Sequence, residues 1–198
     1  SLGATPSIGT GSIRRIAQLT GVWPRAAFAP IRGNLDTRLR KLDGGAHDAL
    51  VLAAAGLRRL GFAARITTTV PARLCVPAPG QGIVAIEIRS GDERVEGPVA
   101  RISERSAAAA LRAERAVIET LGGGCQTPVG ALATPMGGDV LELVATVVAI
   151  DGSHAVRTTA QGSYDEAEAL GARAARQLID DGASAILDEA RRARGTWS

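Results

Sequence analysis

The sequence predicts an α/β domain with a mostly parallel sheet, followed by a small α+β domain with a three-stranded antiparallel sheet. Up to about residue 60, short apolar runs alternate with segments of helical spacing, which is typical of a parallel sheet covered by helices. A stretch rich in proline and glycine, 70–82, then interrupts this alternation. Beyond residue 101 the order changes to one long helix, three strand-like runs and two further helices.

The first domain is expected to open with a strand and with a helix that Gly11 and Ser12 start. Asn34 is a good N-cap for the second helix, and Gly44 with Gly45 ends it. The expected elements of this domain are strand 7–10, helix 13–19, strand 26–31, helix 35–42, strand 48–54 and a helical turn at 56–60.

Residues 83–88 are expected to form a strand with almost no polar face, which needs cover on both sides. One helix is expected over 102–121, with Ser103 as its cap, and turns at 137–139 and 151–152 separate the later strands. The remaining expected elements are strands 129–133, 140–150 and 155–159 and helices 164–180 and 183–192. The predicted division is 1–76 for the α/β domain, 77–100 for a hinge segment and 101–198 for the α+β domain.

Composition excludes several classes of function. With aromatic residues at 3%, an aromatic platform for nucleic-acid bases is not expected. No run approaches the roughly twenty apolar residues of a membrane span, and residues 1–7 resemble a loop from inside a longer chain more than a signal peptide. Two distant cysteines and two histidines indicate neither a disulfide framework nor a zinc site. We therefore expect a cytoplasmic protein that binds no metal and no membrane.

Basic residues gather between residues 10 and 42, where Asp36 is the only acid, although the net charge is only +3. Several of them lie where a strand gives way to a helix, and helix N-termini bind anions. Because such corners meet at one edge of a parallel sheet, we expect a carboxylate or phosphate pocket there; a solvated basic face is the alternative for any single arginine. The basic residues are Arg14, Arg15, Arg25, Arg32, Arg38, Arg40 and Lys41.

Cys125 follows three glycines at the end of the long predicted helix. Glycine is used where the backbone needs unusual angles or where a bulky group must come close. The arrangement indicates a thiol that carries a group on its sulfur atom. The alternative, which the spacing alone favours, is a buried structural cysteine.

These residues together resemble the hydroxymethylbilane synthase family, also called porphobilinogen deaminase. The most specific matches are Ile-Gly-Thr-Gly-Ser-Ile-Arg-Arg over 8–15 and Gly-Gly-Cys-Gln over 123–126. The other matching stretches are 31–39, 41–43, 48–53, 55–61 and 80–82, which follow the family's order and spacing along nearly the whole chain. Gly11 and Gly122 stand where the family usually has serine and glutamate.

The resemblance implies that the α/β domain is like half of a periplasmic-type binding protein. It implies a dipyrromethane cofactor on Cys125, attached by a thioether, on which four porphobilinogen units condense with loss of ammonia in haem (tetrapyrrole) biosynthesis. The implied cofactor contacts are Ser12, Arg14, Arg15 and Arg38, and the implied contacts to porphobilinogen and the growing polypyrrole chain are Arg32, Arg59 and Gly56. Arginine pairs well with the acetate and propionate groups of each pyrrole.

The family's catalytic aspartate lies in a first domain that the resemblance places before this chain. Residues 48–51 are only a superficial echo of its Leu-Val-His-Ser-x-Lys-Asp motif. We therefore expect no catalytic residue here and a transferase that is inactive without that missing N-terminal domain. Residues 77–100 would be the hinge and an orphan strand and helix of the missing domain, and the full-length protein would be a monomer.

Two other functions remain open. The chain could be a non-catalytic binding module for carboxylated pyrroles or other small polyanions, which uses only the arginine pocket. It could also be a nucleic-acid or structural interaction protein, for which the basic cluster is the only support. We rank these after the cofactor-bearing part of a hydroxymethylbilane synthase.

Overall fold

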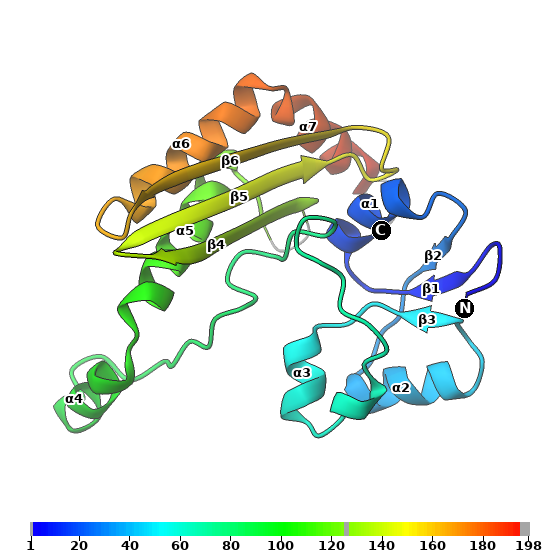
Figure 1. The fold of residues 1–198 in the computed structure, drawn as a ribbon, viewed down its shortest axis with the longest axis horizontal. Helices are drawn as coiled ribbons and strands as arrows, with labels where there is room; N and C mark the ends of the chain where they lie inside the picture. Colours follow the sequence, from blue (N-terminus) through cyan, green and yellow to red (C-terminus); the bar gives the residue numbers. More distant parts are fainter. Residues whose placement is uncertain (1, 125–126, 195–198) are drawn as a thin grey trace.

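The computed structural model describes residues 2–124 and 127–194 of the 198-residue chain. Two sheets of different kind lie side by side, one parallel and one antiparallel, each with its own helices (Figure 1). This arrangement confirms the predicted order of an α/β domain followed by an α+β domain.

The first sheet is parallel and small, and its strand order is β2-β1-β3. Ile8 in the central strand pairs with Phe28 on one side and Ala49 on the other, and its side chain is fully buried. The elements of this half are β1 (Ser7–Gly9), α1 (Ile13–Val22), β2 (Ala27–Ala29), α2 (Leu35–Asp43), β3 (Ala49–Leu50), α3 (Ala54–Arg59) and the 3-10 helix η1 (Ala63–Arg65). All the expected elements of this half are present, although the last strand is far shorter than the expected 48–54.

Two predicted caps define where the first helices begin. Ser12 has extended backbone angles, and its Oγ accepts a hydrogen bond from the Arg15 amide at 3.4 Å. Asn34 caps α2 in the same way, because its Oδ1 accepts from the Thr37 amide at 2.9 Å. Each side chain satisfies a backbone N–H that the helix leaves unpaired.

The second sheet is an antiparallel meander, β4-β5-β6. Its core is rich in alanine and valine and includes leucines with no exposed surface, Leu141 and Leu143 from β5 and Leu170 and Leu178 from the covering helix α6. The elements of this half are α5 (Arg105–Leu121), β4 (Val129–Gly137), β5 (Val140–Val148), β6 (Ala155–Ser163), α6 (Ala167–Asp180) and α7 (Ala183–Arg194). Helices α5 and α6 pack closely against each other as well as against the sheet.

The strand expected over 83–88 is wrong. This segment has no strand assignment, and none of the described residues forms a ladder with it. Val84 and Ile86 are 66% and 53% exposed. Apolar, β-branched residues favour a strand, but a strand exists only where a neighbouring backbone pairs with it.

The long helix expected over 102–121 is confirmed as α5, but it begins three residues later than expected, at Arg105. A separate helix, α4 (Glu93–Ile102), ends just before it, and both Ser103 and Glu104 between them have extended backbones. Ser103 therefore ends α4 instead of capping α5. The proline- and glycine-rich stretch 70–82 is the linker between the two halves. Helix α4 lies apart from both sheets, at the far end of the segment that leads out from this linker (Figure 1).

Candidate functional site

The carboxyl ends of the three parallel strands lead into α1, α2 and α3, so the N-termini of these helices gather at one edge of the sheet. This is the edge where α/β sheets bind ligands. Ser12 lies at the first of these corners, where its amide donates to Thr10 Oγ1 at 3.4 Å. The Ser12 hydroxyl already accepts the capping bond, and its own hydrogen stays available to a ligand.

Arg14 is the most buried of the predicted arginines, with 5% of its surface exposed. Its guanidinium donates to the Val76 carbonyl oxygen and, at 3.2 Å, to Gln81 Oε1, and its Nη1 lies 3.7 Å from the Cys75 sulfur. Burial lowers the pKa of Arg14, while the Cys75 thiol acts in the opposite direction. An arginine starts from so high a pKa that this one keeps its charge.

Arg15 reaches across the end of β3, where its Nη1 donates to the Val51 carbonyl at 2.9 Å. Burial lowers the pKa of Arg15, and the positive charge of Arg38 lowers it further. Arg38 itself donates to the Gly33 carbonyl at 2.8 Å. Three guanidinium groups therefore gather at this edge, and none of them belongs to an ion pair in the described part of the chain. Such a cluster of like charges favours an anion beside it.

The structure places the predicted substrate contacts on the outside of the same half. Arg32 and Arg59 are exposed, and their side chains make no polar contact within 2–124 and 127–194. Gly56 lies in α3 with open space beside it, since an added Cβ would meet no atom within 4 Å. No hydrogen bond or ion pair among the described residues joins these three positions to Arg14, Arg15 or Arg38, so they form a group separate from those three arginines.

Cys125, the predicted cofactor residue, lies outside the described residues. The glycines before it are described, and the first of them has a local reason: Gly122 ends α5 in the left-handed region at φ 62°. Gly123 packs against Thr127, whose Oγ1 would lie 3.1 Å from an added Cβ. One of the three glycines before Cys125 is thus explained by the end of a helix and not by the thiol.

Sequence reasoning missed the contribution of the proline-rich linker to this site. Val76 is held by Gln18 of α1, whose Oε1 accepts from the Val76 amide at 2.7 Å and whose Nε2 donates to the Val76 carbonyl at 3.1 Å. The same linker supplies Cys75 and Gln81 to Arg14. In the sequence only Gln81 pointed to this contribution, because it lies in 80–82, one of the stretches that resemble the family, but no role was predicted for it.

Glu114 is a second residue that the sequence did not reveal. It lies in α5 with 3% of its surface exposed, and its carboxylate accepts from the Gly80 amide at 2.6 Å and from the Ala133 amide at 2.8 Å. Burial raises the pKa of Glu114, and the two amide bonds oppose this effect. The carboxylate joins the linker to β4.

The stability cost of Glu114→Gln is expected to decrease as the pH rises. The folded state holds the Glu114 proton more tightly than the unfolded chain does, so the wild type loses stability as the pH rises from about 4.5 through the raised pKa. Glutamine carries no charge and shares none of this loss. Urea unfolding across this range measures the difference, with Glu119→Gln on the exposed side of α5 as the control. A cost that stays constant or grows with pH would contradict the expectation.

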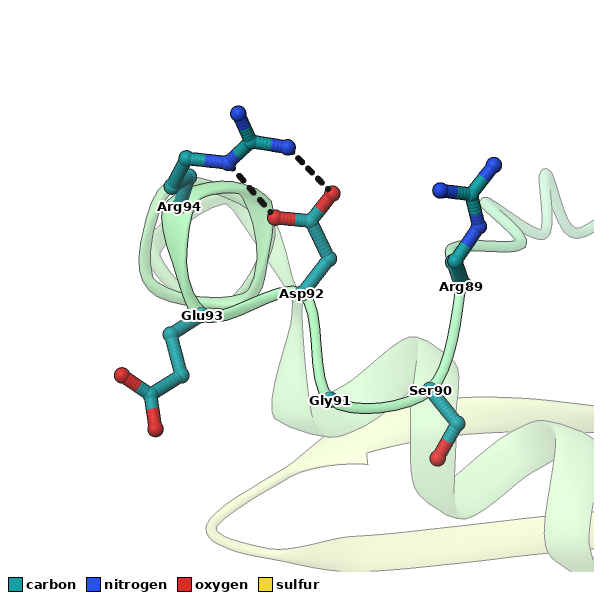
Figure 2. Close-up of a pocket in the computed structure, with 6 residues that line it drawn as sticks. All are labelled: Arg89, Ser90, Gly91, Asp92, Glu93 and Arg94. Carbon is teal, nitrogen blue, oxygen red and sulfur yellow. Dashed lines mark hydrogen bonds and ion pairs between the residues drawn. The ribbon is translucent and has the colours of Figure 1, made fainter.

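Two surface hollows lie elsewhere and include none of the residues predicted to contact cofactor or substrate, although Arg25 of the predicted basic cluster lines the second. One is formed by residues 89–94, at the start of α4, where Figure 2 shows Arg94 paired with Asp92 while Arg89 stands apart. The other lies between the N-terminal residues and the end of α1, around Trp23. In the described residues no cluster of three or more His, Cys, Asp or Glu could hold a metal ion. No described helix has both the length and the apolar character needed to cross a membrane.

Two family models match the chain. Residues 1–97 match the model described as "Porphobilinogen deaminase, dipyromethane cofactor binding domain", and residues 108–180 match "Porphobilinogen deaminase, C-terminal domain". The first match contains all the arginines of the candidate site and the whole linker, 70–82. It therefore identifies the first half as a dipyrromethane cofactor-binding domain.

Curated relatives agree with these matches. The porphobilinogen deaminase of Bordetella parapertussis is 48% identical over 183 residues, which are 92% of this chain and 58% of the relative. Those of Thiobacillus denitrificans and Moorella thermoacetica are 45% and 43% identical, over 91% and 96% of this chain and 59% and 60% of their own length. The chain thus spans about three fifths of the relatives it matches.

Proposed function

This chain belongs to the porphobilinogen deaminase family, and we propose that it supplies the cofactor-binding and C-terminal parts of an enzyme that condenses porphobilinogen in cytoplasmic tetrapyrrole biosynthesis. One observation supports this most directly. Arg14, Arg15 and Arg38 lie at the ligand-binding edge of the parallel sheet, and no described carboxylate pairs with them. A ligand with several carboxylates would balance their charges.

The residues at the site suit acidic pyrroles. Arg14 is held rigidly by Val76 and Gln81 and keeps donors that these contacts do not use, so it can orient a carboxylate without reorganising. Ser12 can donate its hydroxyl hydrogen to a neighbouring acid group. When bound, the dipyrromethane supplies the primer to which porphobilinogen is added. We assign its thioether to the Cys125 sulfur, and the exposed Arg32 and Arg59, with Gly56, to the incoming substrate.

We also propose that the chain works with a segment equivalent to the rest of its relatives' length, which would provide the catalytic aspartate. The exposed apolar residues Val84 and Ile86 support this, because an extended apolar segment gains most from a partner strand. The division into 1–76, 77–100 and 101–198, and a monomeric complete enzyme, belong to the same proposal.

A binding module without catalysis is the second candidate. The observation that favours it is that the arginine cluster lies within this chain and is held by contacts among its own residues. The two candidates differ in whether ammonia is released. We expect porphobilinogen to be bound by the chain alone, and ammonia to be released only when the remaining segment of a relative is added.

When porphobilinogen is added to the chain without its cofactor, we expect it to occupy the cofactor contacts, so its binding should depend on the arginine cluster of Arg14, Arg15 and Arg38. The double variant Arg14→Ala/Arg15→Ala is expected to weaken binding about 100-fold or more, because each charge-assisted contact contributes about 1.5–3 kcal/mol. Isothermal titration calorimetry measures the affinity. The control is Arg173→Ala/Arg176→Ala, which removes the same charge from two exposed positions of α6. Equal losses in both variants would leave only a general charge effect and would overturn the proposed site.

A further inference from the structure

The linker between the two halves is fixed to α1 by buried contacts. Gln18 binds both the amide and the carbonyl of Val76, and Arg14 donates to the same carbonyl and to Gln81. These contacts join residues about sixty positions apart in the sequence. The place of the Arg14 guanidinium therefore depends on where the linker lies.

The C-terminal half holds the other side of the same linker. The Ala131 amide of β4 donates to the Pro77 carbonyl at 3.0 Å, and the Gly80 amide donates to Glu114 at 2.6 Å. Val76 also packs directly on Gly130, where an added Cβ would come within 2.8 Å of the Val76 Cβ. The linker thus lies between α1 and the α5–β4 pair.

We propose that Glu114 is a positioning residue for Arg14, acting through Gly80 and Gln81 to set the geometry of the anion site from the C-terminal half. This rests on the proposed function and adds a residue to its machinery. Glu114 suits the role because both of its carboxylate oxygens are used, one on the linker and one on Ala133 of β4. No described cation pairs with it, so its buried charge is stabilised by these amides.

The chain of contacts from Glu114 to Arg14 is short. Gly80 binds Glu114 through its amide, and the next residue, Gln81, accepts from Arg14 Nη2. Loss of the carboxylate leaves the Gly80 amide without its acceptor and releases this end of the linker. Gly80 has φ +74°, a left-handed conformation that glycine adopts readily, so the released backbone has other conformations to enter.

The first test needs no ligand. Hydrogen exchange followed by NMR on the full chain reports the Gly80 amide and the Arg14 Nε–H. In Glu114→Ala we expect the Gly80 amide to exchange about tenfold faster or more and the Arg14 signal to shift. In Glu114→Gln, which keeps one acceptor and the side-chain shape, both effects should be smaller. Glu119→Ala, an exposed position of the same helix, should change neither. An unchanged Gly80 amide and Arg14 signal in folded Glu114→Gln and Glu114→Ala would overturn the proposal.

The second test is a double-mutant cycle on the binding of porphobilinogen to the chain without its cofactor, where the ligand is expected to occupy the cofactor contacts, and calorimetry measures the affinity. If Glu114 acts through Arg14, Glu114→Gln weakens binding in the wild type and adds little in the Arg14→Ala background. Equal effects of Glu114→Gln in both backgrounds would overturn the positioning role. If Arg14→Ala alone leaves binding unchanged, the proposed role of Arg14 in anion binding is wrong. The exchange experiment still decides whether Glu114 positions the Arg14 side chain.

Discussion

Gly171→Ala is expected to destabilise the protein by about 2–4 kcal/mol, although alanine is the better helix former. Gly171 lies where α6 crosses α5, and a Cβ built on it overlaps the Ala113 carbonyl oxygen and lies 2.7 Å from the Ala116 Cβ. Both neighbours belong to a packed helix, so neither can move aside without separating α5 from α6. Urea unfolding followed by circular dichroism measures the loss.

The matched control for this prediction is Gly97→Ala. Gly97 is also a helical glycine, in α4, but an added Cβ there would meet no atom within 4 Å. Helix propensity alone then acts, and alanine should be neutral or stabilising by up to about 1 kcal/mol. If both variants had the same stability as the wild type, the close approach of α5 and α6 would be contradicted.

Cys125→Ser is expected to abolish covalent attachment of the pyrrole cofactor completely. In the proposed attachment the Cys125 sulfur forms a bond to the methylene carbon of porphobilinogen, the bond from that carbon to the amine breaks, and ammonia leaves. A serine hydroxyl is far harder to ionise and does not replace the thiolate as nucleophile. Intact-mass spectrometry of the chain produced together with the remaining segment of a relative measures the adduct.

Cys75→Ser is the control for attachment, because Cys75 is the other thiol and lies 3.7 Å from Arg14 Nη1. We expect this variant to keep the adduct on the chain. An adduct that survives Cys125→Ser and disappears in Cys75→Ser would move the attachment point to the linker and would contradict the assignment.

The order of elements and the corners of the candidate site could be predicted from the sequence because they depend on local chemistry. Ser12 and Asn34 start helices by accepting bonds from amides three residues away, and Gly122 ends one through its own backbone angle. Strands that alternate with helices bring such corners to one edge. The basic residues at these corners could therefore be predicted to gather at that edge of the sheet.

Other features depend on partners that are distant in the sequence. Residues 83–88 have the composition of a strand, yet no described backbone pairs with them, so the segment forms no strand and residues 84–87 are exposed. In the sequence, Glu114 is one more charged residue of an amphipathic helix. Only the structure shows that the backbone amides of Gly80 and Ala133 donate to its carboxylate. The tertiary structure also decided that Arg14 is buried and held by Val76 and Gln81.

The sequence by itself determined the family, the fold class and the residues that carry the site's charge, because these follow from short-range spacing and from residue type. Only the tertiary structure decided which of those charges are held in place. A hydrogen bond from Arg14 to the linker, or from the linker to Glu114, exists only when folding has brought the two halves of the chain together.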